Sequence, residues 1–315
     1  MNDAAAKYLE RQLLEHPANF IEEFVIQDDP IPTGIAPLDK MLDGGIMPGG
    51  FTVVGGAPGS GKSAIGTAVC YNRAAMGGNP LYISIEMNAL QVRTRMASLN
   101  ASMTNGLMPF AWSRAHESFA STFATDGQRR KWAEGTDEYR REGARRYVEK
   151  FGANDPTICS WRDMESRGIA QRAMVRDDIS EIDAICGIIG ERATVGIHDL
   201  VIVDYAQLVQ VDAKEEYERV TAVSNAFRAQ CKESRCPMLL ISSLRNIQKS
   251  DDEPRLEWFR GSGHIGYDAF AAIVLVGGGY GTEDYKDVTA HVIKNRYGSI
   301  GQVPLMFCPK FNTIE

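Results

Sequence analysis

The segment from Gly56 to Ser63, Gly-Ala-Pro-Gly-Ser-Gly-Lys-Ser, constrains what this chain can fold into more than any other. Its spacing is that of a phosphate-binding loop, in which glycines let the backbone curl until several N–H groups point at one anion. An apolar run at residues 51–54 precedes the loop and a helix-like stretch follows it. This order predicts binding of ATP and Mg²⁺, with Lys62 on the β- and γ-phosphates and Ser63 on the metal. The residues expected to contact ATP are Gly56, Ala57, Pro58, Gly59, Ser60, Gly61, Lys62, Ser63 and Ala64.

Composition narrows the class of protein. A chain of 315 residues can form one large α/β domain whose core needs no staples. The net charge of −7 argues against a broad basic face for duplex DNA, although a local basic channel for a single strand stays open. No secretory signal and no apolar run of about eighteen residues is present, so we expect a cytoplasmic protein without membrane contact.

The cysteines show no zinc-type spacing, and we expect them to be buried thiols in a reducing compartment. They are Cys70, Cys159, Cys186, Cys231, Cys236 and Cys308.

Two units are expected along the chain. Residues 1–30 are interpreted as an amphipathic helical arm, which either packs on its own chain or docks on a neighbouring subunit. Residues 31–315 are interpreted as one ATPase domain. Alternating strands and helices predict an α/β fold with a mostly parallel central sheet flanked by helices, and ligands at the carboxyl ends of the strands.

The apolar runs locate the elements of that sheet. Strands are expected at residues 51–54, 81–85, 157–161, 200–204, 237–242, 271–276, 288–294 and 303–307. Helices are expected at residues 63–75, 179–191 and 216–233.

The region from 97 to 156 is the least legible part of the sequence. Its residues 128–147 are rich in charge, and Asp137/Arg141 stand four apart, as do Glu142/Arg146. Such pairs suit a solvated helix face, with contact to nucleic acid as the alternative.

Two acidic residues follow apolar strands and are candidates for chemistry. Asp204 is expected to hold Mg²⁺ opposite the Ser63 hydroxyl, the alternative being a turn or helix-capping role. Glu86 follows the strand after the phosphate-loop helix, so it is expected next to the γ-phosphate as the catalytic carboxylate that activates water. The alternative for Glu86 is a helix cap.

Small polar and basic residues follow the strand at 237–242. Ser242 and Ser243 are expected to sense the phosphate at the same sheet edge. The Gly-rich stretch after them mixes cations with acids, so it is either a DNA-contacting loop or an ordinary surface loop. The residues expected to bind DNA are Arg245, Lys249, Arg255 and Arg260.

Lys294 and Arg296 lie in a turn between two late strands, far in sequence from the phosphate loop. They could complete a neighbouring subunit's site in the manner of an arginine finger, or they could form an exposed basic turn.

These segments, in this order, resemble the RecA-fold ATPase domain of the DnaB family of replicative ring helicases, over roughly residues 32 to 308. The matching strings are Pro32-Thr-Gly-Ile-Ala-Pro-Leu-Asp39, the phosphate loop, Ser84-Ile-Glu-Met87 with Arg95-Met96, Val203-Asp-Tyr-Ala-Gln-Leu208, Arg260-Gly-Ser-Gly-His-Ile265 with Asp268-Ala269, and Lys294-Asn-Arg-Tyr-Gly298 with Gly301. The first two are shared by RecA-like ATPases, whereas Asp-Tyr-x-Gln-Leu and the R-x-S-G-x-I segment are specific to the DnaB group.

The resemblance implies roles for these residues. Lys62, Ser63 and Asp204 would bind Mg·ATP, Glu86 would be the catalytic carboxylate, and Lys294 with Arg296 would act in trans on the adjoining subunit's γ-phosphate. The loops after Asp204 and Ser242 would line a channel for single-stranded DNA. The family forms hexamers that move 5′ to 3′ along one strand, which implies a ring and partners among other replication proteins.

The sequence departs from the family pattern at several points. Ser243 stands where a Gln is typical, and Gly261 stands where the family usually carries a Glu. Only about 30 residues precede the ATPase region, in place of the family's N-terminal helical domain, and residues 97–156 have no clear counterpart.

Two functions therefore stay open. One is a helicase motor that hydrolyses ATP in a ring on single-stranded DNA. The other is an ATP-gated DNA-binding or helicase-accessory protein of the RadA or KaiC type, with little strand separation.

Overall fold

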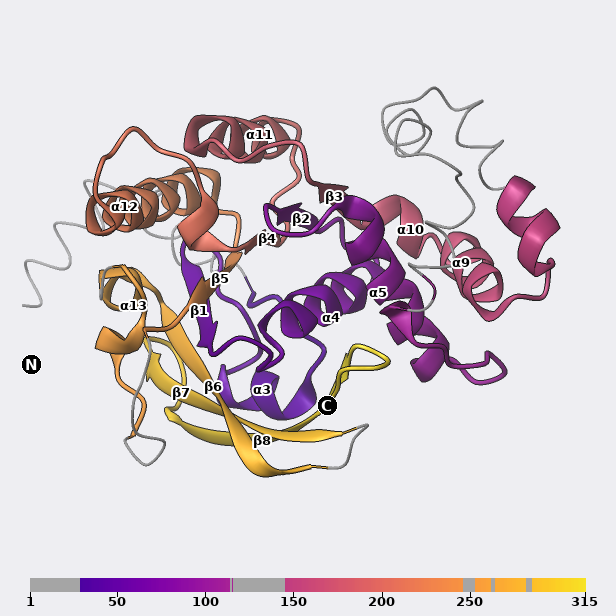
Figure 1. The fold of residues 1–315 in the computed structure, drawn as a ribbon. Coiled ribbons are helices and arrows are strands. Elements are labelled where there is room, and N and C mark those ends of the chain that lie inside the picture. The colour runs from indigo at the N-terminus through magenta and orange to yellow at the C-terminus, as the bar shows by residue number, and fades with distance from the viewer. Residues whose placement is uncertain (1–28, 114, 116–144, 246–252, 262–263, 282–284) are drawn as a thin grey trace, which may run out of the picture.

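The computed structural model describes residues 29–113, 115, 145–245, 253–261, 264–281 and 285–315 (Figure 1). The expected N-terminal arm, most of the charged segment 128–147 and Lys249 lie outside these residues.

The helices and strands follow the expected alternation along most of the described chain. In order they are α3 (Ala36–Met41), β1 (Phe51–Gly56), α4 (Lys62–Ala75), β2 (Leu81–Ser84), α5 (Ala89–Met103), α9 (Pro156–Ser166), α10 (Ile169–Arg172), β3 (Met174–Arg176), α11 (Ile182–Thr194), β4 (Val201–Asp204), the 3-10 turn η1 (Ala206–Leu208), α12 (Glu216–Ser234), β5 (Met238–Ser243), η2 (Leu256–Trp258), α13 (His264–Asp268), β6 (Ala271–Gly281), β7 (Lys286–Asn295), β8 (Gly301–Cys308) and β9 (Thr313–Ile314).

All described strands join one sheet in the order β3-β2-β4-β5-β1-β6-β7-β8-β9. Neighbours from β3 to β6 run parallel, and β6 to β9 run antiparallel. The parallel part needs helical crossovers, whereas short turns suffice between the last strands. The α/β prediction with a mostly parallel sheet is confirmed, and the antiparallel extension carries the Lys294–Arg296 turn.

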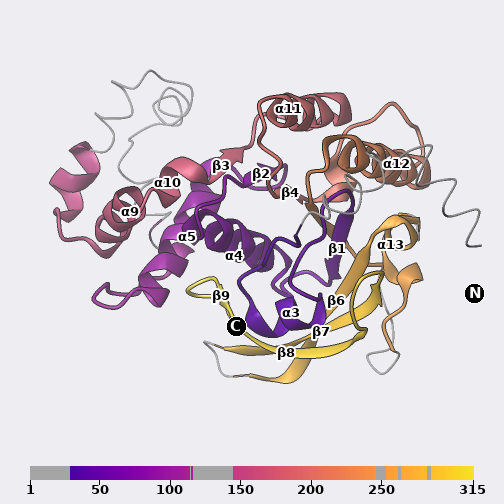
Figure 2. The same ribbon diagram turned by 180° about the vertical axis from the view of Figure 1, so that it is seen from behind.

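Helices cover both faces of the parallel part, as the front and back views show (Figures 1 and 2). Alternate residues of one strand enter different cores: Val54 packs with α4 and α5, while Val53 packs with α11 and α12. A strand buried on both faces has a continuous apolar sequence, which is why the central strands were predictable from sequence.

The strand predicted at residues 157–161 is wrong, because these residues lie in helix α9. The Asp155 carboxylate caps α9 by accepting a hydrogen bond from the Thr157 N–H at 2.9 Å, and Pro156 occupies the first turn. Both are helix-start signals that outweigh a short apolar run. The sheet position is taken instead by the three-residue strand β3, which pairs with β2.

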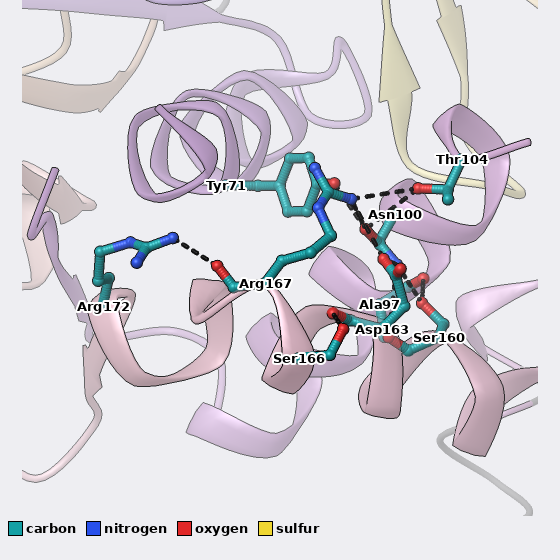
Figure 3. A network of polar contacts seen from close by, with 9 residues as sticks. All are labelled: Tyr71, Ala97, Asn100, Thr104, Ser160, Asp163, Ser166, Arg167 and Arg172. Carbon is teal, nitrogen blue, oxygen red and sulfur yellow. Dashed lines mark hydrogen bonds and ion pairs between the residues drawn. The ribbon is translucent and has the colours of Figure 1, made fainter. Parts of the chain in front are cut away.

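A buried polar network holds α9 against the helices beside it (Figure 3). The amide oxygen of Asn100, on α5, accepts from the Tyr71 hydroxyl of α4 at 2.6 Å and from Arg167 at 3.2 Å. The Asn100 amide nitrogen donates to Ser160 at 3.0 Å and to Asp163 at 3.1 Å. Since Asn100 is fully buried and its amide is bonded on both sides, this network fixes α9 to α4 and α5.

The cysteines are all free thiols, as expected, although only four of them are fully buried, since Cys159 and Cys186 are partly exposed. Burial raises the pKa of the Cys70 and Cys231 thiols, so both stay protonated. Among the described residues, no helix has the length and apolar character needed to span a membrane.

Asp199 ties the connection after α4 to the start of β4. Its carboxylate accepts hydrogen bonds from the Arg73 guanidinium at 2.7 Å and from the backbone N–H groups of Asn79 and Leu200, each at 2.6 Å. Burial acts to raise the pKa of Asp199, but these bonds outweigh it and hold the pKa below its ordinary value.

We expect Asp199→Asn to lower the free energy of unfolding by about 2 kcal/mol at neutral pH, because charged hydrogen bonds are lost. The difference from the unsubstituted chain should shrink as the pH falls below about 3.9, since a carboxylate with a lowered pKa stabilises the fold only while ionised. Denaturant unfolding at several pH values measures both effects. Asp178→Asn is the control, because its pair with Arg176 is exposed and should change stability by less than about 1 kcal/mol.

Candidate nucleotide-binding site

The phosphate loop connects the end of β1 to the start of α4, as predicted. Gly61 has φ +93°, a left-handed conformation that favours glycine, and α4 begins at the next residue. Lys62 Nζ donates to the Gly56 carbonyl at 2.7 Å and to the Ala57 carbonyl at 2.9 Å, so its ammonium lies across the mouth of the loop. Burial lowers the pKa of Lys62, while the charges of Asp204 and Glu86 oppose that shift. The loop and both carboxylates therefore share one site.

Asp204 is fully buried at the carboxyl end of β4. One carboxylate oxygen, Oδ2, accepts from the Tyr82 hydroxyl at 2.7 Å, and the other, Oδ1, has no hydrogen-bond partner among the described residues. Burial raises the pKa of Asp204, opposed by the hydroxyls of Tyr82 and Ser63 and by the charges of Arg95 and Lys62. A free carboxylate oxygen beside a serine hydroxyl is the oxygen donor set that Mg²⁺ takes, so these residues fit the metal.

Glu86 lies two residues beyond the point where β2 and β4 end side by side. Ser84 is in register with Asp204, and the Ile85 N–H donates to the Asp204 carbonyl at 2.8 Å. The Glu86 side chain is exposed. The capping alternative fails, because Asn88 caps α5 by accepting from the Gln91 N–H at 2.9 Å. Glu86 is thus free to face a ligand at the loop.

Ser242 and Ser243 stand beside the first loop glycine, since β5 pairs with β1 through Ser243 and Gly56. Gln207, in η1 after Asp204, joins the two strand ends. Its amide nitrogen donates to Ser242 Oγ at 2.9 Å and to the Arg260 carbonyl at 3.1 Å, and its oxygen accepts from the Ser243 N–H at 3.1 Å. One side chain therefore connects the phosphate edge with the loop expected to bind DNA.

The described cations of that loop lie near its base or along its surface. Arg245 and Arg260 are exposed on either side of a short antiparallel bridge between Leu244 and Phe259, and Arg255 is also exposed. Arg260 also forms an ion pair with Glu216 at 2.9 Å. The structure brings these arginines to the sheet edge that holds the site.

Gly261 departs from the family pattern for a steric reason. Its φ is +87°, and a Cβ at this position would lie 2.6 Å from the Val220 side chain of α12. A glutamate would therefore strain the backbone unless α12 moved.

Lys294 and Arg296 lie away from their own phosphate loop. Ala272 pairs with Lys294 in β7, and Ala271 pairs with Thr52, so the turn lies at the amino end of β1. Gly56 is four residues further along, roughly 13 Å of strand. Lys294 Nζ donates to the Gly266 and Tyr267 carbonyls, while the exposed Arg296 guanidinium lies 5.3 Å from the centre of the Phe270 ring.

Sequence reasoning missed three residues of this edge as site residues: Tyr82, Arg95 and Gln207. The last two lie in the matching strings, but nothing local shows which partners they meet. Tyr82 sits two positions before Ser84, on the same strand face, and that spacing was the available signal.

Comparisons with known proteins agree with the sequence resemblance. Residues 164–315 match the family model described as DnaB-like helicase C-terminal domain, and residues 31–108 match the model of the KaiC ATPase family. The DNA repair protein RadA of Mycobacterium tuberculosis is 47% identical over 66 residues, which make up 21% of this chain and 14% of RadA. RadA of Synechocystis is 36% identical over 72 residues, 23% of this chain and 14% of that protein. The chain thus spans a small part of the curated relatives it matches.

Solved structures confirm the fold. One, described as the ATPase domain of a larger protein, superposes with a TM-score of 0.68 at 18% identity, covering 96% of this chain and 97% of that one. A DnaB-like replicative helicase, described with its interactions with primase, gives 0.70 at 17% identity over 99% of this chain and 70% of its own. The resemblance to the DnaB-type C-terminal domain is confirmed, and the chain carries a RecA-like, helicase-family ATPase domain.

We expect Tyr82→Phe to weaken Mg²⁺-dependent nucleotide binding by about 10-fold, because the substitution removes the hydroxyl that orients the Asp204 carboxylate. Titration of a fluorescent ATP analogue at several Mg²⁺ concentrations measures this. Tyr71→Phe is the matched control: it removes the hydroxyl bonded to Asn100 and should leave the Mg²⁺ dependence unchanged. Equal behaviour of the two variants would refute the orienting role of Tyr82.

Proposed function

We propose that this chain is the motor of a ring helicase, in which six copies hydrolyse ATP between subunits and move 5′ to 3′ on single-stranded DNA during DNA replication. The observation that carries the proposal is the separation of two half-sites on one sheet. The phosphate loop, Asp204 and Glu86 lie at the carboxyl ends of the parallel strands, while the Lys294–Arg296 turn lies at the amino end of β1. A second copy must supply the turn for a complete site.

Each residue at the carboxyl edge has a chemical task in this proposal. Backbone N–H groups of the loop and the Lys62 ammonium bind the phosphates, and Ser63 with Asp204 holds Mg²⁺. Bound Mg²⁺ supplies positive charge to the phosphate oxygens. The Glu86 carboxylate orients the attacking water and accepts its proton. Arg296 of the neighbouring copy stabilises the charge that develops on the transferred phosphate.

Gln207 supports coupling between hydrolysis and DNA. It bonds Ser242 and Ser243, beside the first loop glycine, and the Arg260 carbonyl at the base of the cationic loop. A shift of the strand ends on loss of the γ-phosphate would therefore pull on Arg260 directly. Arg245, Lys249, Arg255 and Arg260 are proposed to contact the phosphates of the strand.

A second function, an ATP-gated DNA-binding or helicase-accessory protein, is favoured by a different observation. Residues 31–108 match the KaiC family, and the RadA matches are confined to about one fifth of the chain. In that case ATP binding would switch an interface with little strand separation.

Single-stranded DNA is expected to stimulate ATP hydrolysis, and the protein is expected to separate a forked duplex carrying a free 5′ tail. Lys62→Ala should lower the hydrolysis rate by about 100-fold, since the phosphates lose their principal cation. Phosphate release and a strand-displacement assay measure these activities. Hydrolysis that ignores DNA, together with an ATP-dependent partner interaction, would favour the accessory function instead.

Mixing two inactive variants tests whether subunits share sites. Arg296→Ala alone should lower hydrolysis about 1,000-fold, the lower range for an arginine finger, and Glu86→Gln alone should also be inactive. In equimolar mixed rings, about a quarter of interfaces pair an intact Glu86 with an intact Arg296, so activity should partly return.

The control for this experiment is Lys286→Ala, because Lys286 is an exposed cation at the other end of β7. Its hydrolysis rate should be that of the unsubstituted chain. Mixed rings that form but recover no activity would rule out sharing.

A further inference from the structure

Arg95 of α5 is a partly buried cation that the proposed chemistry does not use. Among the described residues it has no hydrogen-bond acceptor, and its Nε is buried without a partner. Its guanidinium carbon instead lies 4.1 Å from the centre of the Trp112 ring. Buried guanidinium groups are normally paired with acceptors, so a purely structural role leaves this arrangement unexplained.

The surroundings of Arg95 place it beside the carboxylates of the site. Burial lowers the pKa of Arg95, and the opposing charges come from Tyr82, Asp204 and Glu86. Tyr82 is hydrogen-bonded to Asp204 at 2.7 Å, so Arg95 approaches the same group from the α5 side.

Trp112 is fixed in turn by the segment after α5 and by the C-terminal hairpin. Its indole Nε1–H donates to the Pro309 carbonyl at 2.9 Å, and its backbone N–H donates to the Lys310 carbonyl at 3.2 Å. The Ser98 hydroxyl of α5 donates to the Phe110 carbonyl at 2.6 Å, which holds the segment on the helix. Trp112 is therefore a fixed surface and not a loose side chain.

We propose that Trp112 is a positioning residue, which holds the Arg95 guanidinium by its face so that its N–H edge can orient the Glu86 carboxylate. An indole ring engages a guanidinium through the π-face and leaves the in-plane donors free. A carboxylate partner in place of Trp112 would consume those donors. The inference rests on the proposed function, and it gives residues 104–113 a role in the ATPase site.

Two substitutions of Trp112 separate the aromatic face from the rest of the side chain. Trp112→Phe and Trp112→Leu both lose the N–H bond to Pro309, but only phenylalanine keeps a π-face. Trp112→Leu should lower kcat for ATP hydrolysis by about 10-fold, the size of a partly desolvated cation–π contact, with KM changed less than about 3-fold. Trp112→Phe should retain most of the activity. Equal loss in both, or full activity in Trp112→Leu, would overturn the proposal.

Arg95→Gln serves as the second variant if Trp112→Leu fails to fold. It should lower kcat similarly while binding of a non-hydrolysable ATP analogue is retained. Unchanged kcat in folded Arg95→Gln protein would also overturn the proposal.

A fluorescence measurement tests the contact without any activity. In a protein whose Trp132, Trp161 and Trp258 are replaced by phenylalanine, Trp112 is the sole indole. Arg95→Gln should change its emission in the absence of nucleotide, and unchanged emission would show that the two groups do not stack. Inactive unsubstituted protein with this emission change intact would count against the proposed function and leave the Arg95–Trp112 contact standing.

Discussion

The buried carboxylate of Asp204 is the group on which the candidate site depends. A carboxylate with no exposed surface loses its hydration, and this cost is offset only by donors and cations that the fold brings to it. Tyr82 comes from β2, Ser63 and Lys62 come from the start of α4, and Arg95 comes from α5. Because one oxygen of Asp204 lacks a partner among the described residues, the arrangement is most stable with a cation beside it. Structure and ligand preference have the same origin.

The direction of the strands decides where everything else can act. Parallel neighbours bring the ends of β1, β2, β4 and β5 to one edge, so the phosphate loop, both acids and the two serines meet there. The antiparallel strands after β6 return the chain to the opposite edge, and they carry Lys294 and Arg296 with them. One sheet thereby presents complementary half-sites at its two ends, which is the geometry that head-to-tail assembly requires.

The helices on the α4 side do more than cover the sheet. Asn100 links α5 to Tyr71 of α4 and to α9, while Arg95, earlier on α5, faces the carboxylates. The phosphate-loop helix is therefore braced by a polar network at its far end and by the site at its beginning. Segments that the sequence left without a role, in the region 97–156 and just after it, are attached to that brace through Asp163 and Trp112.

The sequence alone determined the parts of this protein whose chemistry is local. Loop spacing identified Lys62 and Ser63, and apolar runs ending in an acid identified Asp204 and Glu86, because strand polarity brings such ends to one edge. The apolar stretch at 157–161 was misread, since five such residues fit a strand or a helix and the capping residue before them decided between the two. Only the tertiary structure selected Tyr82, Arg95, Trp112 and Gln207. Tyr82 and Asp204 are 122 positions apart, and pairs at such separation leave no periodic trace in a single sequence, because their contact is created by the packing of the whole sheet.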